Sequence, residues 1–222
     1  METPHRDDMR LKRPVFIGTA LFALGFIGIA AAVRGGATAG FDRHVLLSLR
    51  DAANPGDPLG PPWFEEMIAE ISVLGSYTII VIAALSLAAA LVILKLRRAA
   101  LTLLLSLAGG SALSTVSKLY FDRPRPDLVD ALDRTFTASF PSGHAMISML
   151  AWMTMASVIS CHVDNPALRR LAIGLAFSIS LAVGLSRVYL GVHWPSDVLA
   201  GWCLGLTWAG ITWLADHALA GK

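Results

Sequence analysis

The chain has 222 residues, of which 55% are hydrophobic and 15% are charged, and its mean hydropathy is positive. This composition excludes an ordinary soluble domain and predicts an integral membrane protein. The net charge of +2 is too small to indicate a nucleic-acid partner, and no basic tract is interleaved with aromatic residues.

Six apolar stretches are long enough to cross a bilayer as a helix, which takes about 20 residues. They cover residues 14–33, 71–94, 99–116, 142–161, 171–190 and 198–219. Little sequence remains for a soluble domain, so we expect residues 1–222 to form a single all-α membrane domain with six transmembrane helices. The first stretch has the length of a full span and no clear cleavage pattern, so we expect it to stay in the mature protein.

A short amphipathic segment follows the first span. Apolar residues recur there at helical spacing with charged residues between them, which is typical of a short helix lying on the outer membrane surface. The apolar positions are Phe41, Val45, Leu46 and Leu49. His44 lies in the same segment, and the pattern assigns it no chemistry.

Basic residues indicate the orientation of the spans, because cytoplasmic loops carry an excess of Lys and Arg. They gather before the first span and in the turns after the second and fourth spans. These residues are Arg6, Arg10, Lys12 and Arg13, then Lys95, Arg97 and Arg98, then Arg169 and Arg170. We therefore expect both termini on the cytoplasmic side. The loops after the third and fifth spans are two crossings apart, so both should lie on the outer face.

The third span is rich in small residues from Gly109 to Ser114, which favours close packing against neighbouring helices. It ends in the sequence KLYFDRPRP at residues 118–126. Three cations, among them Lys118 and Arg125, and two prolines predict a stiff, positive and non-helical exit from the membrane. A solvated basic loop is the alternative interpretation.

The fourth span begins with the sequence FPSGH at residues 140–144. Ser142 is suited to cap the helix, Gly143 lets another group approach closely, and His144 falls in the first turn. Free N–H groups at a helix N-terminus are natural phosphate sites. The alternative is an ordinary helix cap with an incidental histidine.

The sequence SRVYLGVHWPSD, at residues 186–197, joins the last two spans. Arg187 lies at membrane depth, where an arginine is costly enough to indicate a functional role as the partner of an anion. Asp197 follows His193 by four residues at a helix start, so its carboxylate can accept the imidazole N–H and leave the other ring nitrogen nucleophilic. Taken singly, Arg187 could instead snorkel to the interface and Asp197 could complement the helix dipole.

Together, the three clusters resemble the three-part signature of the type 2 phosphatidic acid phosphatase family (PAP2), which also includes vanadium haloperoxidases and nonspecific acid phosphatases. The first motif fits residues 118–126, the second fits 141–144, and the third fits 186–197. No signature position departs from the pattern. The resemblance implies the helical bundle of the six-span membrane branch of PAP2.

For the site, the resemblance implies a two-step phosphatase that needs no metal or cofactor. His193 would attack phosphorus to form a phosphohistidine, Asp197 would orient it, and His144 would protonate the leaving oxygen. The groups that would hold the phosphoryl oxygens are Lys118, Arg125, Arg187 and the backbone N–H groups of Ser142 and Gly143. The expected substrate is a phosphate monoester or diphosphate of a lipid in a bacterial inner membrane, in the class of phosphatidic acid, phosphatidylglycerophosphate or polyprenyl diphosphate.

Three other interpretations fit parts of the pattern. A haloperoxidase would hold vanadate in the same pocket, but six spans argue against it. A metal site could use His144, His193 and Asp197, but the neighbouring cations would repel the metal. A non-catalytic transporter or scaffold could use the same charges, but these cluster at one face rather than at the midplane.

Overall fold

The computed structural model describes residues 4–133 and 137–220, with side chains from residue 12 to 219. This part of the chain contains eight helices: α1 (Pro4–Arg34), α2 (Ala39–Leu47), α3 (Pro62–Val73), α4 (Tyr77–Ile93), α5 (Arg97–Phe121), α6 (Gly143–Cys161), α7 (Pro166–Tyr189) and α8 (Pro195–Ala220). The side chains of Arg6 and Arg10, used above to orient the spans, lie outside the described residues.

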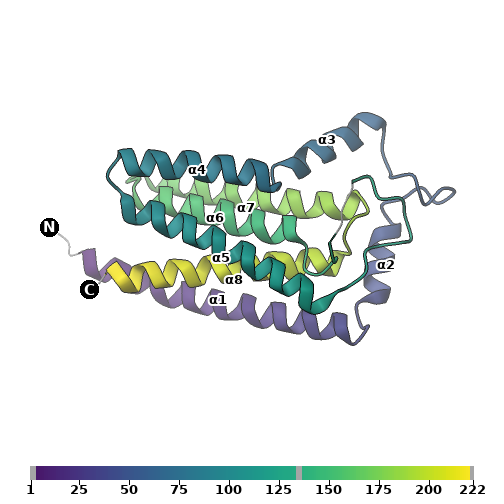
Figure 1. The fold of residues 1–222 in the computed structure, drawn as a ribbon, viewed down its shortest axis with the longest axis horizontal. Helices are drawn as coiled ribbons and strands as arrows, with labels where there is room; N and C mark the ends of the chain where they lie inside the picture. Colours follow the sequence, from purple (N-terminus) through teal and green to yellow (C-terminus); the bar gives the residue numbers. More distant parts are fainter. Residues whose placement is uncertain (1–3, 134–136, 221–222) are drawn as a thin grey trace.

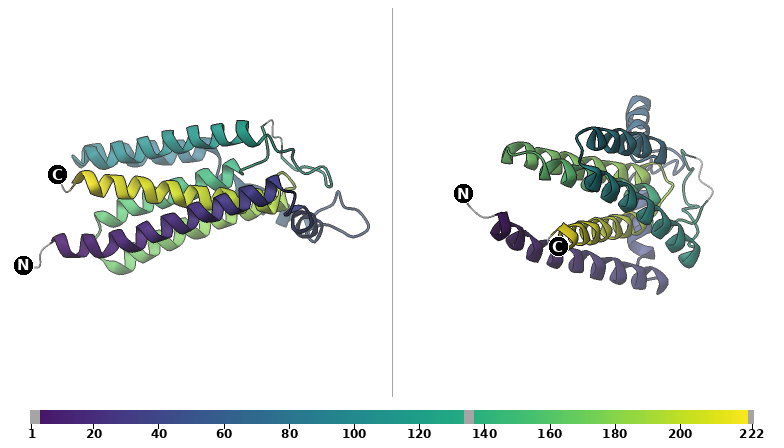
Figure 2. Two further views of the ribbon diagram at one scale, coloured as in Figure 1. Left: turned by 90° about the horizontal axis from the view of Figure 1, so that it is seen from below. Right: turned by 60° about the vertical axis from the view of Figure 1, so that its left-hand side comes forward.

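The long helices run side by side along one axis, and both ends of the chain lie at the same end of the bundle (Figure 1). α1 packs along α8, and α6 packs against α5, α7 and α8. The short helix α2, the segment before α3 and the loop between α5 and α6 gather at the other end, near the turn between α7 and α8 (Figure 1, Figure 2). The loops after the third and fifth spans therefore share one end of the molecule, as the number of crossings predicts.

Five helical segments are long and apolar enough to cross a membrane: Lys12–Arg34, Arg97–Phe121, Gly143–Cys161, Pro166–Tyr189 and Pro195–Leu219. A sixth crossing is present when α3 and α4 are taken together as one span with a bend of 46°. These helices confirm the predicted all-α, multi-pass fold.

The second span is broken, so the prediction of one continuous helix over residues 71–94 is wrong. The chain bends at residues 74–76, between α3 and α4. Gly75 lies so close to α7 that a Cβ atom on it would come within 2.2 Å of Cγ1 of Val183. Ser76 then caps α4 by accepting a hydrogen bond from the N–H of Ile79 at 3.4 Å. The bend carries α3 against α7 and brings Ser72, near the end of α3, into the site described below.

The exit from the third span is more helical than predicted. α5 continues to Phe121, so Lys118 lies on the helix and the non-helical exit begins only at Asp122, whose φ is 41°. A proline restricts its own backbone and that of the residue before it. Pro124 therefore leaves the helix undisturbed up to Phe121. Lys118 consequently has a fixed position one turn before the end of α5.

The short helix predicted after the first span is present as α2, and one of its faces is buried. Phe41 is exposed, whereas Asp42 and Leu46 are buried. Leu46 packs in a small apolar cluster with Val188 of α7 and Val198 of α8. α2 is therefore attached to the end of the bundle where α7 ends and α8 begins.

Close backbone contacts fix α6 against its neighbours. A Cβ atom on Gly201 of α8 would lie 2.8 Å from the carbonyl oxygen of Ser142, and one on Gly205 would meet the next turn of α6 at 2.6 Å. The small residues of the third span also pack closely, as predicted, because a Cβ atom on Gly110 would lie 2.0 Å from Cδ2 of Leu150. These contacts hold the first turns of α6 and α8 together, and both turns carry site residues.

Candidate active site

Six of the eight predicted site residues line a cavity of about 640 Å³ at the end of the bundle opposite the chain termini, and Ser142 and Asp197 lie behind it. Its walls come from α4, α5, the loop after α5, α6, α7 and the turn before α8. The predicted residues that line it are Lys118, Arg125, Gly143, His144, Arg187 and His193. The structure therefore brings together side chains from all three sequence motifs.

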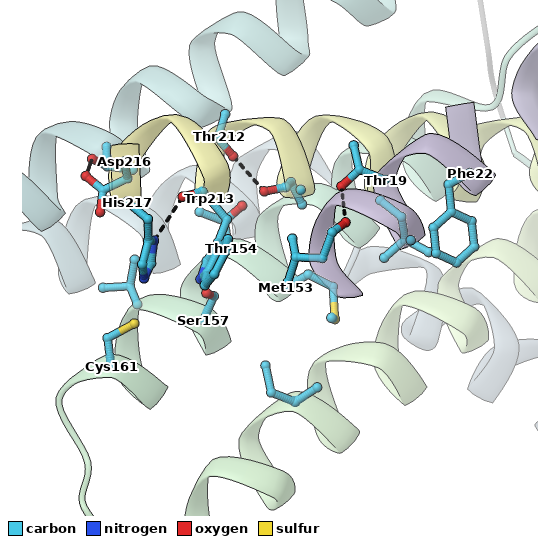
Figure 3. A pocket seen from close by; sticks show the side chains of 18 residues that line it. Thr19, Phe22, Met153, Thr154, Ser157, Cys161, Thr212, Trp213, Asp216 and His217 are labelled. Atoms are coloured by element: carbon cyan, nitrogen blue, oxygen red, sulfur yellow. Dashed lines mark hydrogen bonds between the residues drawn. The ribbon is translucent and has the colours of Figure 1, made fainter. Parts of the chain in front are cut away.

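A second cavity, of about 300 Å³, lies toward the other end of the bundle, between α1, α6 and α8 (Figure 3). Its walls are mostly apolar, with hydroxyl groups such as those of Thr19 and Ser157. His217 lines it and stacks on Trp213, with 3.8 Å between the ring centroids. None of the residues that line this cavity belongs to the three motifs, so the larger cavity is the candidate active site.

His193 and Asp197 form the predicted pair. Pro195 begins α8, which puts Asp197 in the first helical turn, and Oδ2 of its carboxylate lies 3.5 Å from Nδ1 of His193. The same oxygen accepts hydrogen bonds from the N–H of Trp194 at 2.9 Å and from the hydroxyl of Ser139. At 3.5 Å the imidazole contact is longer than an ordinary hydrogen bond, as is common in catalytic pairs without substrate.

The surroundings of His193 favour its neutral form. Burial lowers the pKa of His193 to about 4, against an opposing effect of the Asp197 carboxylate. A guanidinium nitrogen of Arg125, Nη1, lies 3.3 Å from Nε2 of the imidazole, and its positive charge acts in the same direction as burial. The Nε2 atom therefore faces a cation, which is where an anionic phosphate would bind.

Lys118 and Arg125 are held by the loop that follows α5. The ammonium group of Lys118 donates to the carbonyl of Ala138 at 2.7 Å and to the hydroxyl of Thr137 at 3.2 Å. Arg125 donates to the carbonyl of Thr137 at 2.9 Å and to that of Val192 at 2.6 Å. Because both cations are tied to the same short backbone segment, their positions relative to each other are fixed.

Arg187 is buried, with 1% of its surface exposed, so it does not snorkel to the interface. Its Nη1 donates to the hydroxyl of Ser72 at 2.6 Å, and its Nη2 donates to Asp133 at 2.8 Å. The third nitrogen, Nε, is buried without a hydrogen-bond partner among the described residues. Arg187 lines the cavity, so its positive charge would act on an anion bound there.

The second motif differs in part from expectation. Ser142 caps α6 as predicted, but its own N–H donates to the backbone carbonyl of Asp197 at 3.0 Å. That N–H is therefore engaged within the protein, and the expectation that it would hold phosphate is not supported by this geometry. Gly143 lies beside Lys118, where a Cβ atom would be in ordinary van der Waals contact with Cε of that side chain at 3.4 Å. His144 lines the cavity from the first turn of α6.

Residues that the sequence interpretation did not select also surround the site. They are Asp42, Ser72, Arg123, Asp133 and Ser139. Arg123 lies inside the first motif, between Lys118 and Arg125, and this position is the feature of the sequence that could have indicated its role. The others lie outside the motifs, and their contacts join segments that are far apart in the sequence.

The metal alternative has no support in the geometry. Within residues 4–133 and 137–220, no group of three potential ligands is arranged to hold a metal ion. The carboxylate of Asp197 is instead enclosed by donors, which include the guanidinium group of Arg123 at 2.5 Å.

Comparison with known proteins agrees with the fold and the site. A model of the PAP2 superfamily matches residues 99–219. Phosphatidylglycerophosphatase B of Bacillus subtilis (strain 168) is 31% identical over 146 residues, which cover 65% of this chain and 71% of that protein. Undecaprenyl-diphosphatase of Sulfolobus acidocaldarius is 32% identical over 122 residues, which cover 52% of this chain and 54% of that protein.

Among solved structures, the crystal structure of a transmembrane PAP2-type phosphatidylglycerolphosphate phosphatase from Bacillus subtilis is similar over most of its length. The TM-score is 0.82 at 27% identity, and the match covers 90% of this chain and 96% of that chain. The chain therefore belongs to the PAP2 superfamily and is a multi-pass membrane phosphatase, a hydrolase of phosphoric esters.

Proposed function

We propose that the protein removes phosphate from a lipid phosphate monoester or diphosphate, through a phosphohistidine on His193, at the outer face of a bacterial inner membrane. The observation that carries this proposal is the convergence of two histidines and three cations in one cavity. A neutral imidazole supplies a nucleophile, and fixed cations stabilise the charge on the phosphoryl oxygens.

The first chemical step forms a bond between Nε2 of His193 and phosphorus. Nδ1 faces Asp197, which stabilises the positive charge that develops on the ring, and Nε2 faces the cavity beside Arg125. The bond from phosphorus to the ester oxygen breaks as His144 donates a proton to that oxygen. The products of this step are the dephosphorylated alcohol and a phosphohistidine.

The second step hydrolyses the phosphohistidine. His144 has given up its proton, so it accepts one from a water molecule as the water oxygen attacks phosphorus. The bond from Nε2 to phosphorus breaks, inorganic phosphate leaves, and both histidines return to their starting states. Lys118, Arg125 and Arg187 neutralise the phosphoryl group throughout, the part that metal ions play in other phosphatases.

A lipid substrate fits the way the cavity opens. Tyr77 of α4 and Leu119 of α5 line it, and they are 47% and 77% exposed. Both lie on segments assigned to the membrane, so their exposed surfaces face the apolar interior of the bilayer. A lipid could therefore keep its chains in the bilayer while its phosphate enters between α4 and α5. The two relatives above are named for phosphatidylglycerophosphate and undecaprenyl diphosphate, so these lipids are the first substrates to test.

The proposed orientation follows from the basic residues at the end of the bundle that carries the termini. Lys95 lies between α4 and α5 at that end, Arg97 and Arg98 begin α5, and Arg169 and Arg170 lie near the start of α7. An excess of Lys and Arg marks the cytoplasmic side. The cavity at the opposite end then faces outward.

Phosphate release and trapping of the intermediate test the proposal together. Purified protein in detergent is incubated with phosphatidylglycerophosphate, phosphatidic acid and undecaprenyl diphosphate, beside the soluble ester p-nitrophenyl phosphate. We expect release from at least one lipid at a higher kcat/KM than from the soluble ester. Absence of release from all three lipids, with release from the soluble ester, would contradict the lipid assignment.

The intermediate is sought with 32P-labelled substrate and an alkaline quench, because phosphohistidine is stable to base and labile to acid. We expect label on the wild-type protein and none on His193→Ala. With a good leaving group, His144→Ala should still accumulate label, because that leaving group needs no proton whereas hydrolysis still needs the base. Equal labelling of His193→Ala and wild type would overturn the assignment of the nucleophile.

A further inference from the structure

Asp42 lies outside residues 99–219, the part of the chain that matches the family, yet its carboxylate is 1% exposed and contacts the site. It is carried by the short helix α2. Its Oδ1 accepts from the N–H of Ser196 at 2.8 Å, and its Oδ2 accepts from the hydroxyl of Ser196 at 2.7 Å and from Nη2 of Arg123 at 2.8 Å. Burying a charged carboxylate is costly unless it is paired and hydrogen-bonded, and here it is both.

Arg123 connects this carboxylate to the proposed catalytic pair. Its Nη1 donates to Oδ1 of Asp197 at 2.5 Å and to the hydroxyl of Ser196 at 2.8 Å. Its guanidinium carbon lies 5.6 Å from the centroid of the Trp194 ring, and such a stacked position limits rotation of the side chain. One guanidinium group therefore bridges two buried carboxylates, one from α2 and one from α8.

The bridge decides which oxygen of Asp197 faces the histidine. Arg123 occupies Oδ1, while Oδ2 is directed to Nδ1 of His193 by the N–H of Trp194 and the hydroxyl of Ser139. Because both oxygens are held, the carboxylate cannot rotate away from the ring. Arg123 is held in turn by Asp42.

We infer that Arg123 and Asp42 are positioning residues of the phosphatase: Arg123 fixes the carboxylate of Asp197 against His193, and Asp42 on α2 fixes Arg123. The inference depends on the proposed roles of His193 and Asp197. By this inference, α2 contributes a positioning residue to the active site in addition to lying at the membrane surface.

The opposite charges of Arg123 and Asp42 allow a positioning role to be distinguished from a purely structural one. Charged and titratable groups surround the His193–Asp197 pair at two levels. Lys118 (α5), Arg125 (the loop after α5), His144 (α6) and Asp197 (α8) act on His193 directly. Arg123 contacts Asp197, Asp42 (α2) contacts Arg123, and Arg187 (α7) with its partner Asp133 acts on His144. Removing the positive charge of Arg123 should favour protonated His193, whereas removing the negative charge of Asp42 should disfavour it. The two substitutions should therefore shift the acidic limb of the pH–rate profile in opposite directions.

The experiment compares Arg123→Gln, Arg123→Lys and Asp42→Asn with wild type in steady-state assays across pH. Arg98→Gln is the matched control, because Arg98 pairs with Asp216 at 3.0 Å at the opposite end of the bundle. The substrate ionises identically in all assays, so differences in the pH profile between variants belong to the protein. Melting temperature and elution from a sizing column report folding.

We expect kcat to fall by about 10- to 100-fold in Arg123→Gln and in Asp42→Asn, with little change in KM, which is the usual cost of losing a partner that orients a site group. The acidic limb should move to higher pH in Arg123→Gln and to lower pH in Asp42→Asn. Arg123→Lys keeps the charge but loses the planar fork, so it should keep the wild-type limb while kcat falls.

Wild-type kcat in both Arg123 variants would overturn the inference and leave the proposed function intact. Falls in kcat with no shift of the limb, or with shifts in one direction, would also overturn it, because they indicate a general loss of structure. If Asp42→Asn fails to fold, the comparison of Arg123→Gln with Arg123→Lys still decides the question. A different result would contradict the proposed function itself: His193→Ala would keep wild-type turnover.

Discussion

Nδ1 of His193 lies 3.5 Å from Oδ2 of Asp197, and the two residues stand on either side of the start of α8. The geometry follows from the four-residue spacing, because Pro195 begins the helix and so puts Asp197 in its first turn. The carboxylate therefore faces Nδ1 and leaves Nε2 to face the cavity. This arrangement suits an imidazole that is to act as a nucleophile.

Substitutions in this pair should have distinct effects. We expect His193→Ala to abolish turnover and Asp197→Asn to lower kcat by about 10⁴-fold, the loss seen when an orienting carboxylate of a catalytic triad is removed. Binding of inorganic phosphate, measured by calorimetry, should change little in Asp197→Asn because the cations remain. A kcat within a few-fold of wild type in Asp197→Asn would exclude an orienting role.

The depressed pKa of His193 predicts activity at mildly acidic pH. Burial lowers that pKa to about 4, so the ring is still neutral at pH 5, where an ordinary histidine is mostly protonated. The unfolded chain binds this proton more readily than the folded protein, so the stability contribution is present above pH 6.5 and falls as the pH drops toward 4. Between pH 6.5 and pH 4, the free energy of unfolding should fall by about 3 kcal/mol through this one group.

Thermal unfolding of wild type and His193→Gln at pH 7 and pH 5 checks this prediction. The wild-type melting temperature should fall more between the two values than that of the variant, which lacks the titrating group. Other acid-sensitive groups are common to both proteins and cancel in the comparison. An equal fall in both proteins would show that His193 titrates normally.

Features set by local spacing were predictable from the sequence. Ser142 caps α6, and Asp197 lies in the first turn of α8, because both depend on a few neighbouring residues. Convergence of the three motifs was also predictable, since the number of crossings alone puts their loops at one end. What was missed depends on packing: Ser142 contacts Asp197 only because Gly201 lets α8 approach α6.

Partners supplied by distant segments could not be predicted for the same reason. Asp42 reaches Ser196 across 154 residues of sequence, and Ser72 reaches Arg187 across 115. The second contact exists because the chain bends between α3 and α4, and the pattern of apolar residues does not change there. A continuous hydrophobic run reports burial in the bilayer, whereas a bend depends on the neighbouring helix.

The proposed orientation can be tested by labelling single cysteines. In a version with Cys161 and Cys203 replaced by alanine, Asp127→Cys reports the loop at the cavity and Asp164→Cys reports the turn between α6 and α7; both positions are exposed. An impermeant thiol reagent added to intact cells should label Asp127→Cys and spare Asp164→Cys until the membrane is opened. The reverse pattern would invert the topology.

Entry of lipid between α4 and α5 predicts a substitution that separates lipid from soluble substrates. Thr115 is exposed on α5 and lines the cavity, so Thr115→Trp should narrow the opening. We expect kcat/KM for the lipid substrate to fall by about tenfold or more, and that for p-nitrophenyl phosphate to change little. Val116→Trp is the matched control, because Val116 is exposed on the same helix and does not line the cavity. Equal losses in both variants would argue against this route.

Catalysis should need no divalent metal, because the protein supplies the positive charge itself. Lys118, Arg125 and Arg187 line the cavity. These groups can neutralise a phosphate dianion, which is the role of magnesium in sites without such a cluster. Excess EDTA should therefore leave kcat unchanged, whereas Arg187→Ala should reduce it by at least about 100-fold.

Arg187→Lys separates charge from geometry in the same assay. A lysine keeps the charge, but its single ammonium nitrogen cannot reproduce the two separate guanidinium nitrogens that donate to Ser72 and Asp133, so it should recover only part of the lost activity. Loss of activity with EDTA and recovery with zinc or magnesium, together with near-normal Arg187→Ala, would contradict the role of the cations. In that case His144 and His193 would be better interpreted as metal ligands, because a bound metal would then do the work assigned here to the guanidinium and ammonium groups.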